Sequence, residues 1–588
     1  MKKLFYILIL LCGGINLHAQ VRAEEAAPKW TAKAQKAVVS VLTYDQKKEL
    51  LHSGTGAFIQ SDGTAIAPYS LFRGAYSAQV VDMSGNKYPV ERILGASDTY
   101  GMVKFKTAHR KAPALDLPAT SAGTDGGKVY ALGYSKIKPA VCPATTILKK
   151  DMVEGNYAYY TLAQPLDSKH EGDVLFDANG QLAGLVLPSI GGKGYAIDAR
   201  LSAELNIKAI QSKLSGLALQ NIHMPKALPD TPEEALVYLY FQSRTAGNDE
   251  YLDMLNLFVS TYPSNAEGYY RRATPLLDLH RFDDAAADLD TYLKLAADKM
   301  VAHSNVAQTI TSKLLYQPEP AYDKWNFDLA LDHVNQALAL AGQRCAQAAT
   351  DSMRQMAEAD LLEYKLQKAQ VLMGKKDDRG AIEIYDEINA GPYRSATTFL
   401  AASLAHEAAG DSLSEQIAMM DSAIACFYQP LPRDAANYVM RRAKLLAAAN
   451  LYRKSVLDFN TYATLMGSQL NDAFYYDRAM VELDGRMFQQ ALDDLDEAIR
   501  QNPKESLYYV EKSAILLRVN ELDKCVEAAR QCIELDQSNS DAFRILGYAL
   551  LQKGDKNGAR KNLEQAKALG DDSAEKIIQE YLETGTKK

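Results

Sequence analysis

The residues most able to do chemistry are concentrated in one short segment, SKHEGD at positions 168–173. Ser168 carries a hydroxyl nucleophile and His170 is a base two residues away, and these are the residue types that acyl transfer requires. His170, Glu171 and Asp173 are also residue types that bind metals. They are nearly consecutive, however, and no second cluster of such residues accompanies them, so we expect no metal centre.

Cysteines are the second group of reactive residues, and five follow Cys12. They are Cys142, Cys345, Cys426, Cys525 and Cys532. An odd and sparse set is not a disulfide framework. Cys525 and Cys532 share one face of a predicted helix, about 10 Å apart at about 1.5 Å per residue, whereas a disulfide needs Cα atoms within about 7 Å. We expect both to be small packing residues, with metal binding or redox chemistry as the alternative.

Composition and length indicate a folded protein with several domains. The chain has 588 residues, of which 47% are hydrophobic and 23% charged. That length is too great for one hydrophobic core and predicts several domains or a repeat array. The formal net charge of −8, with no basic cluster, argues against nucleic acid as a partner. We expect no cofactor.

The N-terminus predicts export. It begins with the basic residues of MKK, continues with an apolar run over 4–11, and offers a small residue for cleavage in LHA at 17–19. A membrane-spanning helix needs about 20 apolar residues, so we predict a cleaved signal peptide, residues 1–19. Lipidation of Cys12 is disfavoured because no small residue precedes it. No later segment is long enough to span a bilayer, so we expect the periplasm or the outer membrane.

The segments around residues 168–173 are predicted to be β-strands. Short β-branched or apolar runs separated by Gly and Asp turns occupy residues 30–200, which predicts an all-β barrel or sandwich. Residues 201–231 follow as a helix over 201–217 and a proline-punctuated linker. Helices then begin at Thr231, with Thr231 as N-cap, Pro232 in the first turn and Glu234 completing a capping box.

The helical half contains an internal repeat. One unit places Ala479 four residues after an aromatic residue, Ala491 twelve later, then Leu495 and a Pro at the loop. Counterparts of these small and apolar positions are Ala273, Ala285, Leu289; Ala369, Ala381, Tyr385; Ala443, Ser455, Phe459; Ser513, Cys525, Ala529; and Gly547, Ala559, Leu563. This pattern resembles the tetratricopeptide repeat (TPR) family, which implies an all-α solenoid. We predict about nine repeats over 232–570, with a capping helix and tail over 571–588.

The β-rich half resembles the trypsin-like serine proteases of the HtrA (DegP) type over about 170 residues. The matching segments, in family order, are SGTGAFI at 53–59 with the turn at 62–63, ALG at 131–133, LFDANGQLAG at 175–184 and GYAI at 194–197. The resemblance implies a chymotrypsin-like double barrel. The predicted fold class is therefore multidomain, an all-β double barrel followed by an all-α solenoid.

The same resemblance implies that the catalytic triad is absent. Ser70 stands where the family has its His, Tyr100 where it has its Asp, and Glu171 where it has its nucleophilic Ser. A carboxylate at Glu171 would repel a developing oxyanion, and Asp173 adds negative charge nearby. Using Ser168 as nucleophile instead would shift the alignment by three residues and break its match. We therefore predict a pseudo-protease that is not an enzyme.

The repeat register also identifies candidate groove residues. The positions on the helix that would line a concave surface include Tyr270, Met440, Lys444, Tyr476 and Tyr548. Lys444 is the only basic residue among them, which disfavours a clamp for a C-terminal carboxylate. Aromatic groove positions suit a partner's hydrophobic face, and packing between neighbouring repeats is the alternative role for these tyrosines.

These inferences converge on a binding protein. Solenoids present long surfaces to other proteins, so we expect a non-catalytic interaction or scaffold protein, an accessory subunit of a periplasmic or outer-membrane assembly whose partners are other envelope proteins. Two alternatives stay open from the sequence. One is a divergent active serine protease whose repeats recruit substrate, and the other is a chaperone-like holdase of the periplasm.

Overall fold

The computed structural model describes residues 27–136, 141–153, 156–164, 166, 170–210 and 213–583. The predicted signal peptide, Cys12, Ser168 and the last five residues lie outside them. The chain divides into two compact units, Met1–Leu295 and Ala296–Lys588, and each is described by itself. No helix in the described ranges is long and apolar enough to cross a bilayer.

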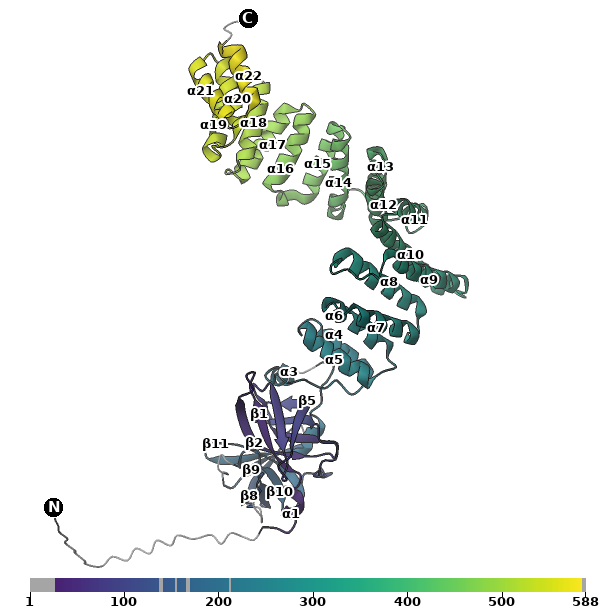
Figure 1. Ribbon diagram of the computed structural model, residues 1–588, viewed down its shortest axis with the longest axis vertical. Helices are drawn as coiled ribbons and strands as arrows, with labels where there is room; N and C mark the ends of the chain where they lie inside the picture. Colours follow the sequence, from purple (N-terminus) through teal and green to yellow (C-terminus); the bar gives the residue numbers. More distant parts are fainter. Residues whose placement is uncertain are drawn as a thin grey trace, which may run out of the picture. The chain divides into compact units, whose positions relative to one another are not determined.

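The first barrel follows the short helix α1 (Thr31–Ala34; Figure 1) and closes in the order β1-β2-β3-β6-β5-β4. Its strands are β1 (Val38–Tyr44), β2 (Leu50–Phe58), β3 (Thr64–Pro68), β4 (Ser77–Val81), β5 (Lys87–Ser97) and β6 (Met102–Thr107). One helical turn, α2 (Tyr69–Phe72), separates β3 from β4. All five residues of β3 are buried, whereas β1 alternates between buried and half-buried positions towards its end, as strands with one inward face do.

The second barrel closes in the order β10-β11-β12-β9-β8-β7. Its strands are β7 (Lys128–Leu132), β8 (Ala144–Val153), β9 (Tyr157–Leu162), β10 (Val174–Asp177), β11 (Leu182–Ile190) and β12 (Lys193–Asp198). Apolar residues of both barrels, among them Met102, Leu132 and Phe176, form one shared core between them. Two closed six-stranded barrels confirm the predicted chymotrypsin-like β fold.

The predicted helix over 201–217 is wrong. The chain instead makes a 3-10 turn (Ala199–Ala203), runs without regular structure to residue 210, and forms α3 (Lys213–Gln220). The physical reason is close packing on β5, because a Cβ on Gly95 would lie 2.3 Å from the backbone oxygen of Leu205. Alternate residues Leu205 and Ile207 are buried there, an extended pattern that helical periodicity cannot reproduce.

Four helices complete the first unit: α4 (Pro232–Gln242), α5 (Asn248–Thr261), α6 (Ala266–Asp278) and α7 (Phe282–Leu295). The N-cap prediction is confirmed, since the Thr231 side chain accepts from the backbone N–H of Glu234 at 3.3 Å. The reciprocal bond of a capping box is not formed among the described residues, so that part of the prediction is wrong.

The second unit is helical throughout its described part (Figure 1). Its helices are α8 (Lys299–Tyr316), α9 (Phe327–Ala346), α10 (Asp351–Lys375), α11 (Asp378–Ala390), α12 (Ala396–Ala408), α13 (Leu413–Ala425), α14 (Ala436–Ala448), α15 (Tyr452–Met466), α16 (Asp472–Asp484), α17 (Phe488–Gln501), α18 (Ser506–Arg518), α19 (Leu522–Leu535), α20 (Ser540–Gln552), α21 (Lys556–Ala568) and α22 (Asp572–Ile577). A π-helical turn, Ile578–Glu583, ends it. The predicted all-α region after the barrels is confirmed.

Small residues let paired helices approach closely. The Ser455 hydroxyl of α15 donates to the backbone oxygen of Ala443 in α14 at 2.8 Å. In the pair α20–α21, a Cβ on Gly547 would lie 2.7 Å from Cγ of Leu563. Cys525 and Cys532 are buried on α19 and not joined in a disulfide. The sequence spacing therefore identified true helix-packing positions.

Candidate functional site

Ser70 and Glu171 come from different barrels and meet in the structure. Ser70 lies in α2, directly after β3, where the backbone N–H of Tyr69 donates to the oxygen of Gly101 at 2.9 Å. Glu171 lies in the loop before β10. The hydroxyl of Ser70 donates a hydrogen bond to Oε1 of Glu171 at 3.2 Å. Two of the three residues predicted at triad positions are therefore in direct contact.

Gly172 makes this approach possible. Its φ of +84° lies in the left-handed region that favours glycine. A Cβ here would lie 2.6 Å from Cγ of Pro68 at the end of β3, and the N–H of Gly172 donates to the oxygen of Val186 at 2.9 Å. The loop that carries Glu171 is thus fixed against the first barrel by its neighbour.

Tyr100 lies in the turn between β5 and β6. Its backbone N–H donates a hydrogen bond to the hydroxyl oxygen of Ser97 at 3.2 Å, and its ring packs on the core shared by the two barrels. A phenol in a hydrophobic contact cannot act as the carboxylate that orients a catalytic imidazole. Tyr100 therefore has a packing role in this arrangement.

His170 and Asp173 form a second pair beside Glu171. Nδ1 of His170 lies 2.7 Å from Oδ2 of Asp173, and the hydroxyl of Thr55 donates to Oδ1 of Asp173 at 3.1 Å. Asp173 is buried, and burial raises the pKa of its carboxyl although both hydrogen bonds oppose that shift. The Asp173 carboxylate therefore belongs to the protein interior and orients His170, rather than lining the cleft as charge alone suggested.

Cys142 is close enough to the His170–Asp173 pair for its thiol to be affected by the charge of Asp173. Burial, together with a smaller contribution from the charge of Asp173, raises the pKa of Cys142 to about 12. The thiolate is the nucleophilic form of cysteine, so Cys142 is inert at neutral pH. Among the described residues, no three His, Cys, Asp or Glu side chains converge as metal ligands.

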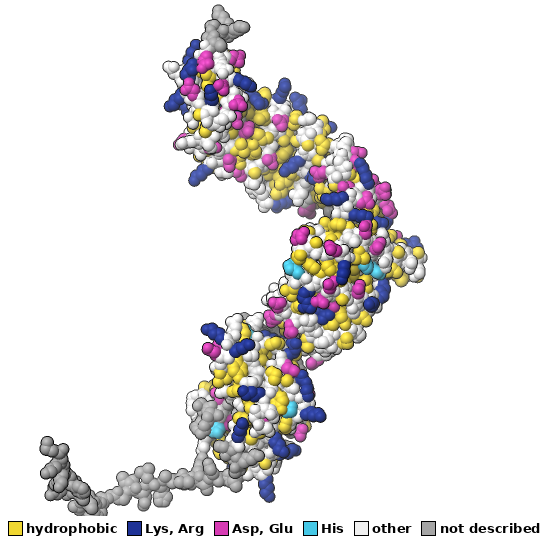
Figure 2. All heavy atoms as spheres, viewed as in Figure 1, with side chains coloured by type: hydrophobic (Ala, Val, Ile, Leu, Met, Phe, Trp, Pro, Cys, Tyr) yellow, Lys and Arg dark blue, Asp and Glu magenta, His cyan; other side chains and the backbone are white. Residues whose placement is uncertain are grey.

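The predicted groove tyrosines each contact another aromatic ring. Tyr270 stacks on Tyr292 with centroids 4.9 Å apart, and Tyr476 lies 5.3 Å from Tyr508. Tyr548 meets Tyr581 edge to face at 6.3 Å. All three predicted positions are half-buried. Figure 2 shows hydrophobic side chains gathered over α16 and α17, the region of Tyr476.

Met440 and Lys444 lie in a groove of about 530 Å³ in the second unit. Three helices line it: Glu407 comes from α12, Leu413 and Gln416 come from α13, and Asn437, Met440, Arg441, Lys444, Leu445 and Ala448 come from α14. The lining mixes apolar and polar side chains in similar numbers. We call this cavity the α14 groove.

Two buried polar atoms beside the α14 groove lack a hydrogen-bond partner among the described residues. Gln416 is only 5% exposed, and while its amide nitrogen donates to the backbone oxygen of Asp411, its buried Oε1 has no partner among the described residues. Arg441 pairs with Glu407 at 2.8 Å, but its Nε is likewise unpartnered there. Lys444 is exposed at the same groove. Both unpartnered atoms are shielded from solvent, so the charged groups of the groove that a ligand reaches directly are the exposed Lys444 and Glu407.

Comparison with known proteins finds HtrA-type proteases among solved structures and no matching family model. The chain is similar to "HtrA-type protease AlgW with tripeptide", with 18% identity and a TM-score of 0.26, over 30% of this chain and 60% of that one. It is similar to the serine endoprotease from Yersinia pestis at the same identity and TM-score, over 30% of this chain and 62% of that one. The chain therefore spans less than two thirds of these proteins.

Sequence reasoning missed Asn437, Arg441 and Gln416. Asn437, Arg441 and Lys444 follow one another at spacings of four and three, which places them on one helical face. That spacing is a signal that a search for periodic polar residues would have found. Gln416 carries no such signal, because its importance comes from burial beneath a neighbouring helix.

Proposed function

We propose that this protein is a non-catalytic scaffold of the cell envelope, in which a trypsin-like pseudo-protease domain is fused to TPR repeats. It would serve as an accessory subunit of a periplasmic or outer-membrane assembly. The observation that carries the proposal is the hydrogen bond between Ser70 and Glu171. A carboxylate sits where the family resemblance requires the nucleophile, and its negative charge opposes the oxyanion of acyl transfer.

A serine-reactive fluorophosphonate probe tests the absence of catalysis. The folded full-length protein should remain unlabelled at concentrations that label an active trypsin-like protease completely. Labelling that disappears in Ser168→Ala would contradict the proposal and would establish the divergent-protease alternative. That alternative draws its support from His170 and Asp173, whose contact at 2.7 Å reproduces the base and its orienting carboxylate.

The α14 groove supports the binding role. Its lining combines apolar Met440 and Leu445 with the exposed charges of Lys444 and Glu407, a combination that suits an extended segment of a partner protein. Crosslinking in envelopes solubilised with gentle detergent should identify partners whose recovery falls in Lys444→Glu. Lys454→Glu is the matched control, since Lys454 is an exposed lysine on the neighbouring α15. Equal loss in both variants would assign the effect to charge alone and reject the groove.

A further inference from the structure

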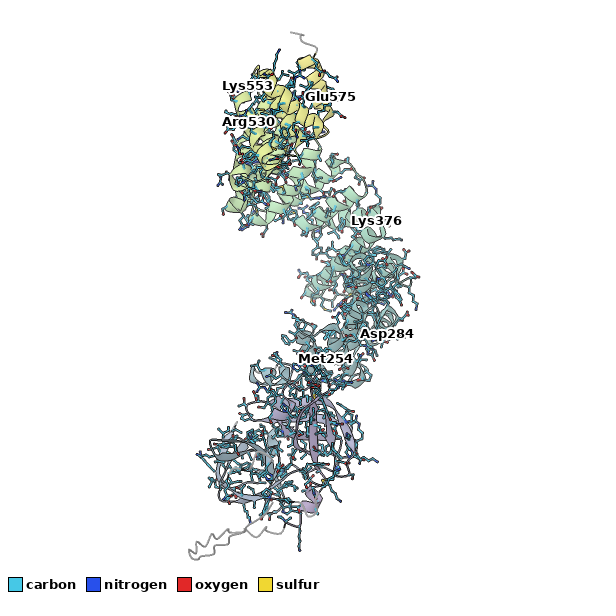
Figure 3. All side chains as sticks on the ribbon, turned by 60° about the vertical axis from the view of Figure 1, so that its left-hand side comes forward. Met254, Asp284, Lys376, Arg530, Lys553 and Glu575 are labelled. Carbon is cyan, nitrogen blue, oxygen red and sulfur yellow. The ribbon has the colours of Figure 1, made fainter. Side chains whose placement is uncertain are left out.

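A second cavity lies in the first unit, where the first barrel meets α3, α4 and α5. It has a volume of about 640 Å³, within the range of about 300–1,000 Å³ typical of small-molecule sites. Its lining includes Lys226, Tyr238, Phe241, Glu250 and Met254. We call it the barrel–helix pocket. Figure 3 labels Met254 on α5, where that helix faces the strands.

Lys226 is held rigidly at one wall of this pocket. Its segment bridges Ile93 of β5, with the N–H of Ile93 bonded to Pro225 and the N–H of Ala227 bonded to Ile93, both at 2.8 Å. Arg92 donates to the backbone oxygen of Lys226 at 3.3 Å. The backbone is therefore fixed while the side chain lines the cavity, so the barrel determines where the lysine side chain enters the pocket.

Two donors in the barrel–helix pocket lack protein acceptors. Neither the ammonium of Lys226 nor the hydroxyl of Tyr238 has a hydrogen-bond partner among the described residues, although Tyr238 is only 6% exposed. Burial lowers the pKa of Lys226 and raises the pKa of Tyr238 to about 12. Both shifts reflect partial withdrawal of the two groups from water by the surrounding residues. Neither Lys226 Nζ nor the Tyr238 oxygen is among the fully buried polar atoms that lack a partner, so both face accessible space in the pocket, where a ligand oxygen would accept from them.

The rest of the lining is apolar. Leu219 and Met254 are buried, and Tyr76, Ile210 and Phe241 leave a large hydrophobic surface exposed at the same cavity. Tyr76 stacks on His223 with centroids 4.5 Å apart, which fixes both rings. Glu250 is the single carboxylate of the lining; it attracts Lys226 without forming an ion pair. An occupant therefore needs an apolar body and one acceptor-rich head.

We propose that the barrel–helix pocket binds a monocarboxylate with an apolar body, its carboxylate accepting from Lys226 and Tyr238 and its body lying on Phe241, Met254 and Ile210. The class includes free aliphatic acids and the C-terminus of a peptide that ends in an apolar residue. This inference is independent of the scaffold role, because the lining of the barrel–helix pocket includes neither Ser70, nor Glu171, nor any residue of the α14 groove.

The test is titration of the full-length protein, labelled with ¹³C at methionine methyl groups, with octanoate, octan-1-ol and N-acetyl-phenylalanine. Met254 is the reporter, assigned by Met254→Leu. Octanoate should shift its methyl signal saturably and bind at least about 10-fold more tightly than octan-1-ol, as expected for one charge-assisted hydrogen bond. The ratio of octanoate to N-acetyl-phenylalanine affinity then distinguishes a free acid from a peptide terminus.

Substitutions of the two charged lining residues should change octanoate binding in opposite directions. Lys226→Met should remove the preference for octanoate over octan-1-ol, whereas Glu250→Gln, an exposed residue, should strengthen octanoate binding by about 2- to 5-fold by removing repulsion. Lys36→Met, an exposed lysine outside the pocket, should change nothing. The proposal is overturned if octanoate and octan-1-ol bind the native chain equally, if the Met254 signal never saturates, or if Glu250→Gln weakens binding. The last outcome applies even where Lys226→Met fails to fold.

Discussion

One acidic side chain occupies a core position of the repeat. Three residues after the small residue of the first helix, other pairs carry a buried leucine: Leu276, Leu372, Leu446, Leu516 and Leu550. In α16 the same position is Glu482, which is 4% exposed, and its Oε2 has no hydrogen-bond partner in the described ranges. Burial and the neighbouring Asp494 raise the pKa of Glu482 to about 8, with Arg478 opposing.

Glu482 should make stability depend on pH. An unfolded glutamate has a pKa of about 4.3, so between that value and about 8 the folded state binds the extra proton. The free energy of unfolding therefore falls as pH rises through this window. Glu482→Leu should be more stable than the native chain at pH 8, by about 1–3 kcal/mol, and nearly equal at pH 4. Amide hydrogen exchange in α16 and α17 measures this difference. An unchanged pH slope in Glu482→Leu would contradict the assignment.

Cysteine reactivity should separate by burial. Burial raises the pKa of Cys525 and of Cys532 to about 11, whereas Cys426 is exposed. A thiol reagent at pH 8 should modify Cys426 rapidly and leave the other two unmodified until denaturant is added. Counting thiols in denaturant without reductant should find both free. A disulfide between them would show that the helical register is wrong there.

Individual residues also show which parts of the candidate sites can be predicted from the sequence. Ser70 and Glu171 were predicted as counterparts in one site, and they are in contact. Met440 and Lys444 were predicted as groove residues and line one cavity. Gln416 was missed, because an unpartnered atom is created by the helices that surround it and has no trace in residue type or spacing. Glu482 could have been found, as the one acid in an otherwise leucine position.

At the scale of helices, the same ionic clamp recurs in three pairs. Arg272 with Asp288, Arg442 with Asp458 and Arg478 with Asp494 each join two nitrogens to two oxygens at 2.6–2.7 Å. Each arginine also donates to the preceding helix, to Asn256, Asp421 and Asn460 respectively. The buried aspartates need this pairing, since an unpaired buried charge is costly. The clamps therefore fix the first helix of each pair between its two neighbours.

Replacing one partner of a clamp should lower the stability of the protein more than replacing both partners. Arg442→Met leaves Asp458 buried without its partner and should lower stability by about 3–5 kcal/mol. Adding Asp458→Leu should restore most of that loss, because both charges are then gone. Thermal unfolding with hydrogen exchange in α14 and α15 measures the cycle, with exposed Arg453→Met as control. Equal stability of the single and double variants would mean that the clamp carries no charge penalty.

Helices were easier to predict than the connection between barrels and helices. Spacings of small residues mark positions where backbones meet, so Ala443, Ser455 and Cys525 were found from sequence alone. The segment over 201–217 failed for the opposite reason. Its conformation is set by contact with Gly95 on a strand distant in sequence, and local periodicity contains no information on that contact.

At the scale of the whole molecule, the change in composition near residue 231 does not mark the end of a hydrophobic core. One cluster joins Phe58 and Ile93 of the first barrel to Leu239 of α4 and to Leu255 and Phe258 of α5. Composition separates the strands from the helices near residue 231, but one cluster of buried residues includes side chains from both sides of that position. The chain instead divides into its two compact units between Leu295 and Ala296.

Fragment design should follow this shared core. A fragment of residues 27–295 should be soluble and melt cooperatively, whereas 27–231 should aggregate. The shorter fragment loses Leu239, Leu255 and Phe258, each worth about 1.5–3 kcal/mol when buried, which is a large part of the about 5–15 kcal/mol that stabilises a domain. Residues 296–583 should also fold alone, because helical repeats depend on their nearest neighbours. Differential scanning calorimetry and limited proteolysis compare the three fragments. A soluble, cooperatively melting 27–231 would show that the barrels need no helices, and the barrel–helix pocket would then be a contact between independent domains rather than part of one core.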